Sequence, residues 1–325
     1  MKIAVLWATW FVGSHVVRHF FGIWDTVYGF GRRNMQWHIH KFCTYILLTA
    51  ENIVQYWPFD VVINCIADVG YGKQDTNLHK ILLDILNNIA TKHLIHISTS
   101  SVYMWLEKPL QESLNIAATS LMNAYAKNKL LIENSVMWTS HIPKITILRP
   151  RAIYWCRDRV LLYHILKSTI KNRVLFFWKS ETNILMSMTH IKSLLEAITC
   201  VITQQSSPKE IYNVADSKAY NVYAVFAAVS KVFFNTYPIS LNKNILHIMK
   251  LLNYNKYLWI KDIFTKDTVL DCNKIQQIWY QWNNNFFETL PFVYTWWKQD
   301  IWSVINMKKK LSDIPWMAWG NFDCK

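Results

Sequence analysis

Glycine is scarce in this sequence, which has only seven glycines among 325 residues and as many as 17 tryptophans. Average usage would give roughly 7% glycine. Internal repeats and low-complexity linkers are lacking as well, and 52% of the residues are hydrophobic, so the composition does not indicate disorder. A chain of this length suits one large domain or two closely joined ones.

Long apolar runs and paired cysteines are also missing. No run approaches the roughly 20 apolar residues that a membrane helix needs, so we expect a protein without a membrane span. The apolar amino terminus lacks the cleavage site of a signal peptide. The six cysteines form no CxxC pair, and we therefore expect reduced thiols, no metal and a cytoplasmic location.

Acidic residues are outnumbered by basic ones, 21 to 35, which gives a formal net charge of +14. The basic residues are spread along the chain, with KKK at 308–310 as the one tight run. They do not form a stripe interleaved with aromatics, so nucleic-acid binding is not expected. A basic surface would instead attract an anionic cofactor or a nucleotide-linked small molecule.

Segments with strand and helix patterns alternate along the first half of the chain. Strands are predicted at 3–6, 26–33, 59–68, 94–103 and 144–150, and helices from about residue 11 and over 75–93 and 120–137. The alternation predicts an α/β fold with a Rossmann-type, doubly wound parallel sheet. Beyond residue 156 it loosens, with helices predicted near 160–171 and 191–203 and strands near 174–178, 184–189 and 211–215.

The stretch LWATWFVG, residues 6–13, joins the first strand to the first helix. A βα unit that binds a nucleotide needs glycine in this turn for a tight bend, for close approach of the backbone to a pyrophosphate, and for packing of the helix on the strand. Gly13 holds the last of these places, whereas Trp7 and Trp10 hold the other two. The turn raises the question whether the protein can bind a dinucleotide.

A tyrosine and a lysine four residues apart on a helix share one face, so the ammonium can lower the pKa of the phenol and make it an acid or base near neutral pH. This spacing occurs four times, at Tyr125/Lys129, Tyr163/Lys167, Tyr257/Lys261 and Tyr294/Lys298. Only the first pair follows a strand that ends in hydroxyl residues, STSS at 98–101. Ligands bind at such strand ends in a parallel sheet.

The order and spacing of these segments resemble the extended short-chain dehydrogenase/reductases, also called the NAD-dependent epimerase/dehydratase family. The landmarks are the opening turn, FDVVINCIAD, ISTSSVY, NAYAKNK, ITILRPRAIY, TNILMSMTHIKSLLEAI and IYNVAD. The resemblance implies an NAD(P)-binding Rossmann domain at 1–156, a smaller substrate domain mainly at 157–306 that is partly interleaved with the first, a tail at 307–325, and a homodimer. The RDRVLL segment at 157–162 favours the hydroxysteroid-dehydrogenase-like branch.

The resemblance also implies roles for single residues. Tyr125 is the expected catalytic acid/base, and Lys129 the residue that lowers its pKa and holds the nicotinamide ribose. Thr99 is the expected hydroxyl that orients the substrate oxygen, with Ser100 as the close alternative. The expected cofactor contacts are Trp7, Trp10, Phe11, Val12, Gly13 and Ala67, and the expected substrate contacts are Ser100 and Arg157.

A structural explanation of these residues stays open: Thr99 and Ser100 would then satisfy only backbone groups of the turn, and Tyr125 would be a half-buried helix aromatic. His190, at a strand end, is expected to be a packed residue and not a catalyst.

The end of the second strand bears on the choice of cofactor. An acidic residue there binds free ribose hydroxyls, whereas arginine accommodates a 2′-phosphate. The sequence reads GFGRRN and has no carboxylate, so Arg32 and Arg33 favour NADP over NAD. The alternative is that both arginines are solvated in a surface turn.

We therefore expect an NAD(P)-dependent oxidoreductase or epimerase that moves a hydride between the nicotinamide and a hydroxyl or keto carbon, while Tyr125 transfers the proton. The substrate would be a nucleotide sugar or a steroid-like or β-keto compound. Residues 98–101 offer only hydroxyls, which disfavours a dehydratase. The alternative, motivated by Trp7 and Trp10, is a non-catalytic Rossmann scaffold that has lost dinucleotide binding.

Tryptophan recurs where the family has glycine, at positions 7, 10, 155, 178 and 279. We hypothesise that some of these codons are UGA, which the source organism reads as glycine. Random divergence is the rival explanation, because serine and asparagine stand at two other family glycines, Ser217 and Asn172.

Overall fold

The structure is a computed structural model of the chain. It describes residues 1–23, 26–32, 39, 41–66, 82–86, 88–103, 106, 110–112, 116, 122, 124–158, 160–162, 165–166, 183–204, 207–238, 266–278 and 284–300. The chain divides into two compact units, the first made of residues 1–151, 191–215 and 270–281 and the second of residues 152–190, 216–269 and 282–325.

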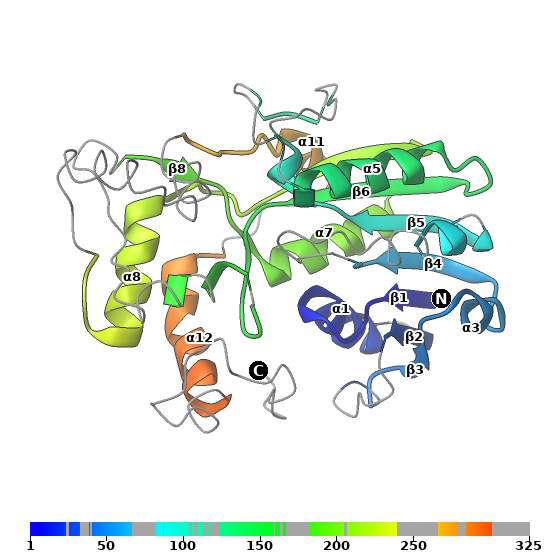
Figure 1. The fold of residues 1–325 in the computed structure, drawn as a ribbon, viewed down its shortest axis with the longest axis horizontal. Coiled ribbons are helices and arrows are strands. Elements are labelled where there is room, and N and C mark those ends of the chain that lie inside the picture. The colour runs from blue at the N-terminus through cyan, green and yellow to red at the C-terminus, as the bar shows by residue number, and fades with distance from the viewer. Residues whose placement is uncertain are drawn as a thin grey trace. The chain divides into compact units, whose positions relative to one another are not determined.

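Among the described residues, seven strands form the sheet of the first unit, and every pairing in it is parallel (Figure 1). Their spatial order is β3 (Thr44–Leu47), β2 (Thr26–Gly31), β1 (Lys2–Leu6), β4 (Phe59–Asn64), β5 (Thr91–Ile97), β6 (Lys144–Pro150) and β10 (Lys209–Val214). The order reverses between β1 and β4, which makes that point the topological switch of a doubly wound sheet. The predicted Rossmann-type parallel sheet is confirmed.

The strand ends near the switch are level with one another. Leu6 pairs with Phe30 of β2 and with Asn64 of β4, and Asn64 pairs with His96 of β5. The residues that follow these four strands therefore leave the sheet along one edge. In doubly wound sheets, ligands bind beyond this edge.

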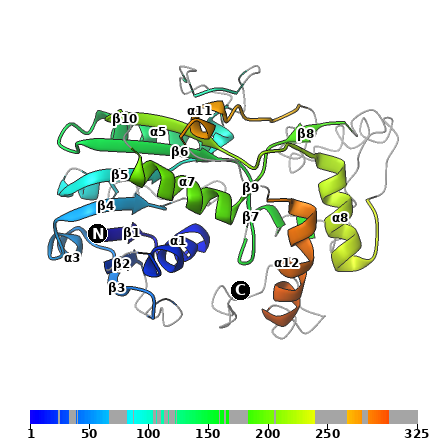
Figure 2. The same cartoon turned by 180° about the vertical axis from the view of Figure 1, so that it is seen from behind.

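Helices cover both faces of the sheet. α1 (Phe11–Phe21) and α7 (Ile191–Thr203) pack together on the face that is nearer the viewer in Figure 2, where His19 Nε2 lies 2.9 Å from Thr199 Oγ1. α5 (Ala124–Trp138) lies on the other face. Its Val136 joins a core cluster with apolar side chains from the helical residues 82–86 and from α3 (Ala50–Val54). The unit also contains α11 (Asn273–Gln276) and the 3-10 turn η1 (Ser100–Tyr103).

In its described residues, the second unit has two small strand pairs and two long helices. β7 (Ile153–Tyr154) pairs in parallel with β9 (Thr189–His190), and β8 (Leu185–Met186) pairs antiparallel with β11 (Tyr220–Asn221). α8 (Val222–Phe234) and α12 (Phe286–Asp300) contact each other around a shared apolar core. The assignment of cofactor and substrate roles to 1–156 and 157–306 stays a prediction, and the tail at 307–325 lies outside the described residues.

Several predicted boundaries agree with the structure, notably β6 and α7. The helix predicted over 75–93 was wrong at its carboxyl end, because β5 begins at Thr91. The strand predicted at 174–178 lies outside the described residues.

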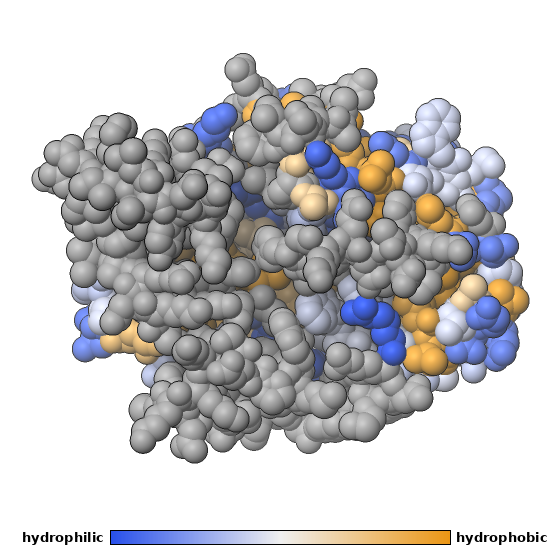
Figure 3. All heavy atoms as spheres, in the orientation of Figure 1, coloured by the Kyte–Doolittle hydropathy of each residue, from blue (hydrophilic) through white to orange (hydrophobic). Residues whose placement is uncertain are grey.

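Among the described helices, none combines the length and the apolar character that a membrane span requires. Cys43, Cys65, Cys200 and Cys272 are free thiols, as predicted, whereas Cys156 is disulfide-bonded. On the face drawn in Figure 3, hydrophilic and hydrophobic side chains are interspersed over the part of the first unit that is coloured.

Candidate active site

The turn after β1 is held by backbone hydrogen bonds. Trp10 N donates to Trp7 O at 3.1 Å, and Ser14 N donates to Trp10 O at 2.8 Å as α1 begins. A Cβ atom on Gly13 would lie 2.2 Å from Trp7 O, so only glycine allows the helix to approach the turn this closely. Gly13 therefore has the packing role that the third glycine of such a turn requires.

Trp7 has a φ of 65°, in the left-handed region. This conformation costs a residue with a Cβ atom about 1–2 kcal/mol, and glycine adopts it freely. Trp10 differs, because its φ of −83° and ψ of 171° describe an extended residue at the N-cap of α1. The backbone thus gives a reason for glycine at position 7 but none at position 10.

The two indoles lie against each other, with ring centroids 5.9 Å apart and an interplanar angle of 22°. The guanidinium carbon of Arg32 lies 4.8 Å from the centre of the Trp7 ring. Trp7 is buried, so its indole fills the space between the first turn and the end of β2. A dinucleotide held by a Rossmann unit places its pyrophosphate at this turn and its adenosine ribose near the end of β2, and the Trp7 side chain does not fit such a ligand.

The remaining predicted cofactor contacts are only partly described. Phe11 is buried at the start of α1, and Val12 beside it is half-buried. Arg32 is exposed directly after β2. Ala67 and Arg33 lie outside the described residues.

Lys129 lies at the ends of β4 and β5. Its side chain is 2% exposed, and Nζ donates to Ile66 O and Ile97 O, each at 2.9 Å. A buried ammonium needs such partners because desolvation disfavours its charge. Tyr125 is half-buried one helical turn earlier on α5, and side chains four residues apart share a helix face. The pair that the sequence singled out therefore sits on the helix beside the switch point.

The charge of Lys129 acts on two buried neighbours. The His96 pKa is held well below its usual value by burial and then by Lys129. Burial raises the pKa of the Cys65 thiol to about 12, and the Lys129 charge opposes this rise. His96 Nδ1 is 3.0 Å from Asn64 Nδ2, so a neutral imidazole accepts that hydrogen bond. Lys129 therefore supplies a positive charge at the carboxyl ends of β4 and β5.

The hydroxyl run follows β5. Thr99 Oγ1 accepts a hydrogen bond from Ser101 N and donates one to Ser101 Oγ, both at 3.1 Å. Ser100 is 2% exposed and Thr99 is 8% exposed. Thr99 thus satisfies a backbone group of the turn, as the structural explanation expects, and the choice between Thr99 and Ser100 as the substrate hydroxyl stays open.

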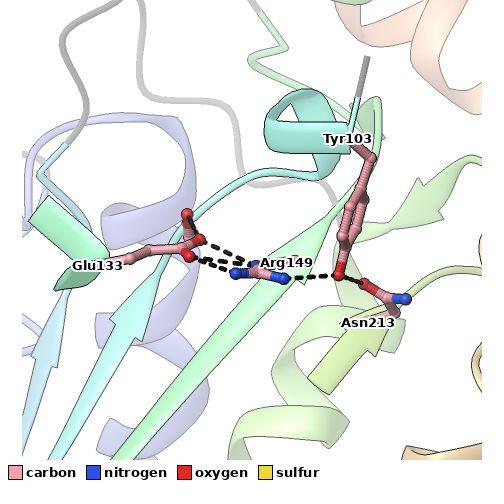
Figure 4. Close-up of polar contacts among 5 residues, drawn as sticks. Tyr103, Glu133, Arg149 and Asn213 are labelled. Atoms are coloured by element: carbon pink, nitrogen blue, oxygen red, sulfur yellow. Dashed lines mark hydrogen bonds and ion pairs between the residues drawn. The ribbon is translucent and has the colours of Figure 1, made fainter. Parts of the chain in front are cut away.

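A buried polar network, which the sequence did not reveal, joins α5 to β6, to β10 and to both ends of this loop. Arg149 on β6 donates to Glu133 on α5 through Nε, 3.0 Å from Oε1, and through Nη2, 2.5 Å from Oε2. Its Nη1 donates to the Tyr103 hydroxyl at 2.8 Å, which donates to Asn213 Oδ1 at 2.8 Å (Figure 4). Ser98 Oγ also donates to Glu133.

This network anchors both ends of the loop that carries Thr99 and Ser100. Ser98 precedes the two hydroxyl residues, and Tyr103 follows them. Glu133 lies one helical turn beyond Lys129 on α5, so the same contacts fix the helix that bears the tyrosine and lysine. Burial raises the Tyr103 pKa to about 12 against the charge of Arg149, and the phenol stays a neutral structural donor.

The remaining predicted residues belong to the second unit. Arg157 is buried and has a φ of 70°. His190 is buried, its ring centroid is 5.1 Å from that of Tyr154, and its backbone N donates to Asp216 Oδ1 at 2.9 Å. These contacts of His190 agree with the expectation that it is a packed structural residue. Tyr294 and Lys298 lie on α12, whereas the tyrosine–lysine pairs at 163/167 and 257/261 lie outside the described residues.

The chain matches the model of the NAD dependent epimerase/dehydratase family over residues 3–215. It therefore belongs to that family, and the prediction of an enzyme of the epimerase/dehydratase type is confirmed at this level. A comparison with curated proteins found no match.

Solved structures with the same fold include proteins that act on or bind nucleotide sugars. MoeE5 in complex with UDP-glucuronic acid and NAD is 14% identical, over 93% of this chain and 100% of that chain, with a TM-score of 0.68. UDP-glucuronic acid 4-epimerase from Bacillus cereus in complex with NAD is 19% identical, over 95% and 100%, with a TM-score of 0.68. UDP-N-acetylglucosamine 4-epimerase from Bacillus cereus is 17% identical, over 98% and 100%, with a TM-score of 0.66. Likeness at this identity establishes the fold.

Proposed function

We propose that the protein is an NAD(P)-dependent oxidoreductase or epimerase that acts on a hydroxyl or keto carbon of a nucleotide sugar. The observation that carries the proposal is the position of Lys129, whose buried ammonium lies at the carboxyl ends of β4 and β5 on the helix that bears Tyr125. A positive charge at this point favours the ionised form of a nearby phenol. The same ammonium can donate a hydrogen bond to a ribose hydroxyl of a bound nucleotide.

Three side chains divide the proton chemistry in this proposal. Tyr125 gives or takes the proton at the substrate oxygen. The charge of Lys129 lowers the pKa of the Tyr125 phenol toward neutral pH, so that the phenol can act as an acid or a base. Thr99 or Ser100 donates a hydrogen bond that orients the same oxygen. The loop that holds the two hydroxyls is anchored through Ser98 and Tyr103, so the three groups rest on one buried framework.

The dinucleotide, when bound, would supply the hydride acceptor and donor. The sheet order, Gly13 and Lys129 fit such a cofactor, whereas the Trp7 indole between the turn and the end of β2 does not. Arg32, exposed after β2, and Arg33 favour NADP, while the NAD-bound structures of the same fold favour NAD. The proposal therefore covers both dinucleotides.

The substrate class is inferred from chemistry and from the neighbours together. Structures of this fold hold UDP-glucuronic acid or UDP-glucose, and a net charge of +14 would attract such anions. The steroid-like and β-keto substrates of the hydroxysteroid-dehydrogenase-like branch stay predictions that rest on RDRVLL alone. A homodimer and a cytoplasmic location are likewise part of the proposal.

The second candidate function is a non-catalytic scaffold. One observation favours it: Trp7 is buried, stacks on Trp10 and lies under Arg32, in the space that a dinucleotide needs. A protein with this indole would keep the fold and lose the cofactor.

Product analysis by NMR tests the proposed function. The protein with the substitutions Trp7→Gly and Trp10→Gly, supplied with NAD or NADP, is incubated with UDP-glucose, UDP-glucuronic acid and UDP-N-acetylglucosamine in turn, and the sugar carbons are examined for inversion or oxidation. Inversion or oxidation of one of them, lost in Tyr125→Phe, supports the proposal. Unchanged sugars together with no dinucleotide binding favour the scaffold.

A further inference from the structure

Position 7 carries a side chain that its backbone disfavours. Among the described tryptophans, Trp7 is the one with a positive φ. The loop around it keeps glycine-type geometry, because Trp7 O would lie 2.2 Å from a Cβ on Gly13. Of the three glycine places in a dinucleotide-binding turn, one is still filled and a second keeps the conformation that glycine adopts freely.

Two tryptophans of the second unit, Trp296 and Trp297, differ from Trp7 in backbone conformation, because both lie within helix α12. Trp296 and Trp297 are each 4% exposed and belong to the apolar core around α12. A glycine at either position would leave a cavity and weaken the helix. Trp7 is buried as well, at 6% exposure in the apolar cluster that includes Phe30 and Leu48, so its left-handed backbone, and not its burial, sets it apart.

The composition of the chain points the same way. Seven glycines and 17 tryptophans together make up about 7% of the 325 residues, the share that glycine alone usually takes. An exchange of glycine for tryptophan at many positions accounts for both the deficit and the excess. Random divergence spreads lost glycines over other residue types, as at Ser217 and Asn172, and does not by itself produce an excess of tryptophan.

We infer that residue 7, and residue 10 with it, is glycine in the protein that the native organism makes, and that its codons there are UGA. The inference rests on the proposed function for position 10, whose extended backbone accepts any residue and where only the approach of a pyrophosphate requires glycine. At position 7 the inference rests on the positive φ of the backbone. Glycine at both positions removes the two stacked indoles and opens the turn to a dinucleotide.

Codon reading and peptide mass test the inference directly. UGA is expected at codons 7 and 10, and UGG at codons 296 and 297, which serve as the internal control. The amino-terminal peptide isolated from the native organism should have the mass of glycine at position 7. UGG at codon 7, or tryptophan at position 7 in the native peptide, overturns the inference.

A dinucleotide-binding experiment distinguishes failure of this inference from failure of the proposed function. NADH and NADPH are titrated into the chain as printed, into Trp7→Gly/Trp10→Gly, and into Trp138→Gly, which removes an indole that is 85% exposed on α5. Saturable binding by the double variant only is expected. If the native peptide contains glycine but the double variant binds neither dinucleotide, the inference on residue 7 stands and the proposed function fails.

Discussion

Arg149 on β6 and Glu133 on α5 form a two-pronged ion pair in the core of the first unit, with Nη2 2.5 Å from Oε2. The side chains are 4% and 2% exposed. A carboxylate and a guanidinium in this geometry compensate each other's desolvation, and neither charge is tolerable alone. The pair holds α5, and with it Tyr125 and Lys129, against the sheet.

Breaking this pair from one side should destabilise the protein strongly. Glu133→Gln leaves the Arg149 charge buried without its counterion, and we expect the free energy of unfolding to fall by about 3–5 kcal/mol. Urea denaturation measures this loss. Lys92→Ala is the matched control, because it removes the exposed ion pair between Lys92 and Asp60 and should cost at most about 1 kcal/mol. Equal losses in the two variants would contradict the role of the buried pair.

Tyr125→Phe should abolish most turnover and leave dinucleotide affinity nearly unchanged, because the phenol acts on the proton in the transition state. General acid–base groups contribute roughly 10²–10⁴-fold to rate. Steady-state kinetics and a dinucleotide titration, both made in the Trp7→Gly/Trp10→Gly protein, measure the two effects. Tyr294→Phe removes the same hydroxyl from a tyrosine that also precedes a lysine by four residues on a helix, and it should change neither. Weaker dinucleotide binding in Tyr125→Phe would argue against proton transfer as its role.

The strands and helices of the parallel sheet were largely predictable, because buried parallel strands are continuous apolar runs and the covering helices are amphipathic. β3 and α3 escaped prediction. β3 lies at the sheet edge, and its four residues, TYIL, are all exposed or half-buried, so the strand is too short for its pattern to stand out. α3 has only five residues, of which Ile53 alone is buried.

The common helix of Tyr125 and Lys129 was predictable, although their spacing occurs four times in the sequence and only the preceding hydroxyl run favoured this pair; their catalytic roles stay a prediction. The partners of Lys129 were not visible. Its two acceptors are backbone carbonyls 63 and 32 residues away, and any residue type supplies a carbonyl. The Glu133–Arg149 pair was hidden for a similar reason: charged residues are usually solvated, and only the packed fold shows that these two are buried.

Arg32→Ala with Arg33→Ala should lower affinity for NADPH more than for NADH, if these arginines bind a 2′-phosphate. A charge-assisted contact of this kind is worth roughly 1.5–3 kcal/mol. The titration is made in the Trp7→Gly/Trp10→Gly protein, so that the indole under Arg32 does not obscure the result. Equal losses for the two cofactors would show that the arginines provide only general attraction.

Acid should destabilise the protein through buried histidines. Burial, and then the Lys144 charge, lowers the His93 pKa to about 3, whereas an unfolded histidine titrates near 6.5. Between these values the unfolded state binds more protons, so stability falls as the pH drops, by about 1.4 kcal/mol per pH unit for this group. Unfolding free energies measured from about pH 6 to about pH 4 should therefore fall less steeply in His93→Gln. Parallel curves would contradict a neutral, buried His93.

The most direct test of the account is a titration of NADH into the Trp7→Gly/Trp10→Gly protein, with and without Lys129→Met. We predict saturable binding that Lys129→Met weakens at least about tenfold, because a charge-assisted hydrogen bond is lost. Lys127→Met, the same change two residues earlier on α5, should leave the affinity unchanged. No saturable binding in the glycine-bearing protein, or equal affinity with and without Lys129, would contradict the assignment of this site as the dinucleotide site of an enzyme.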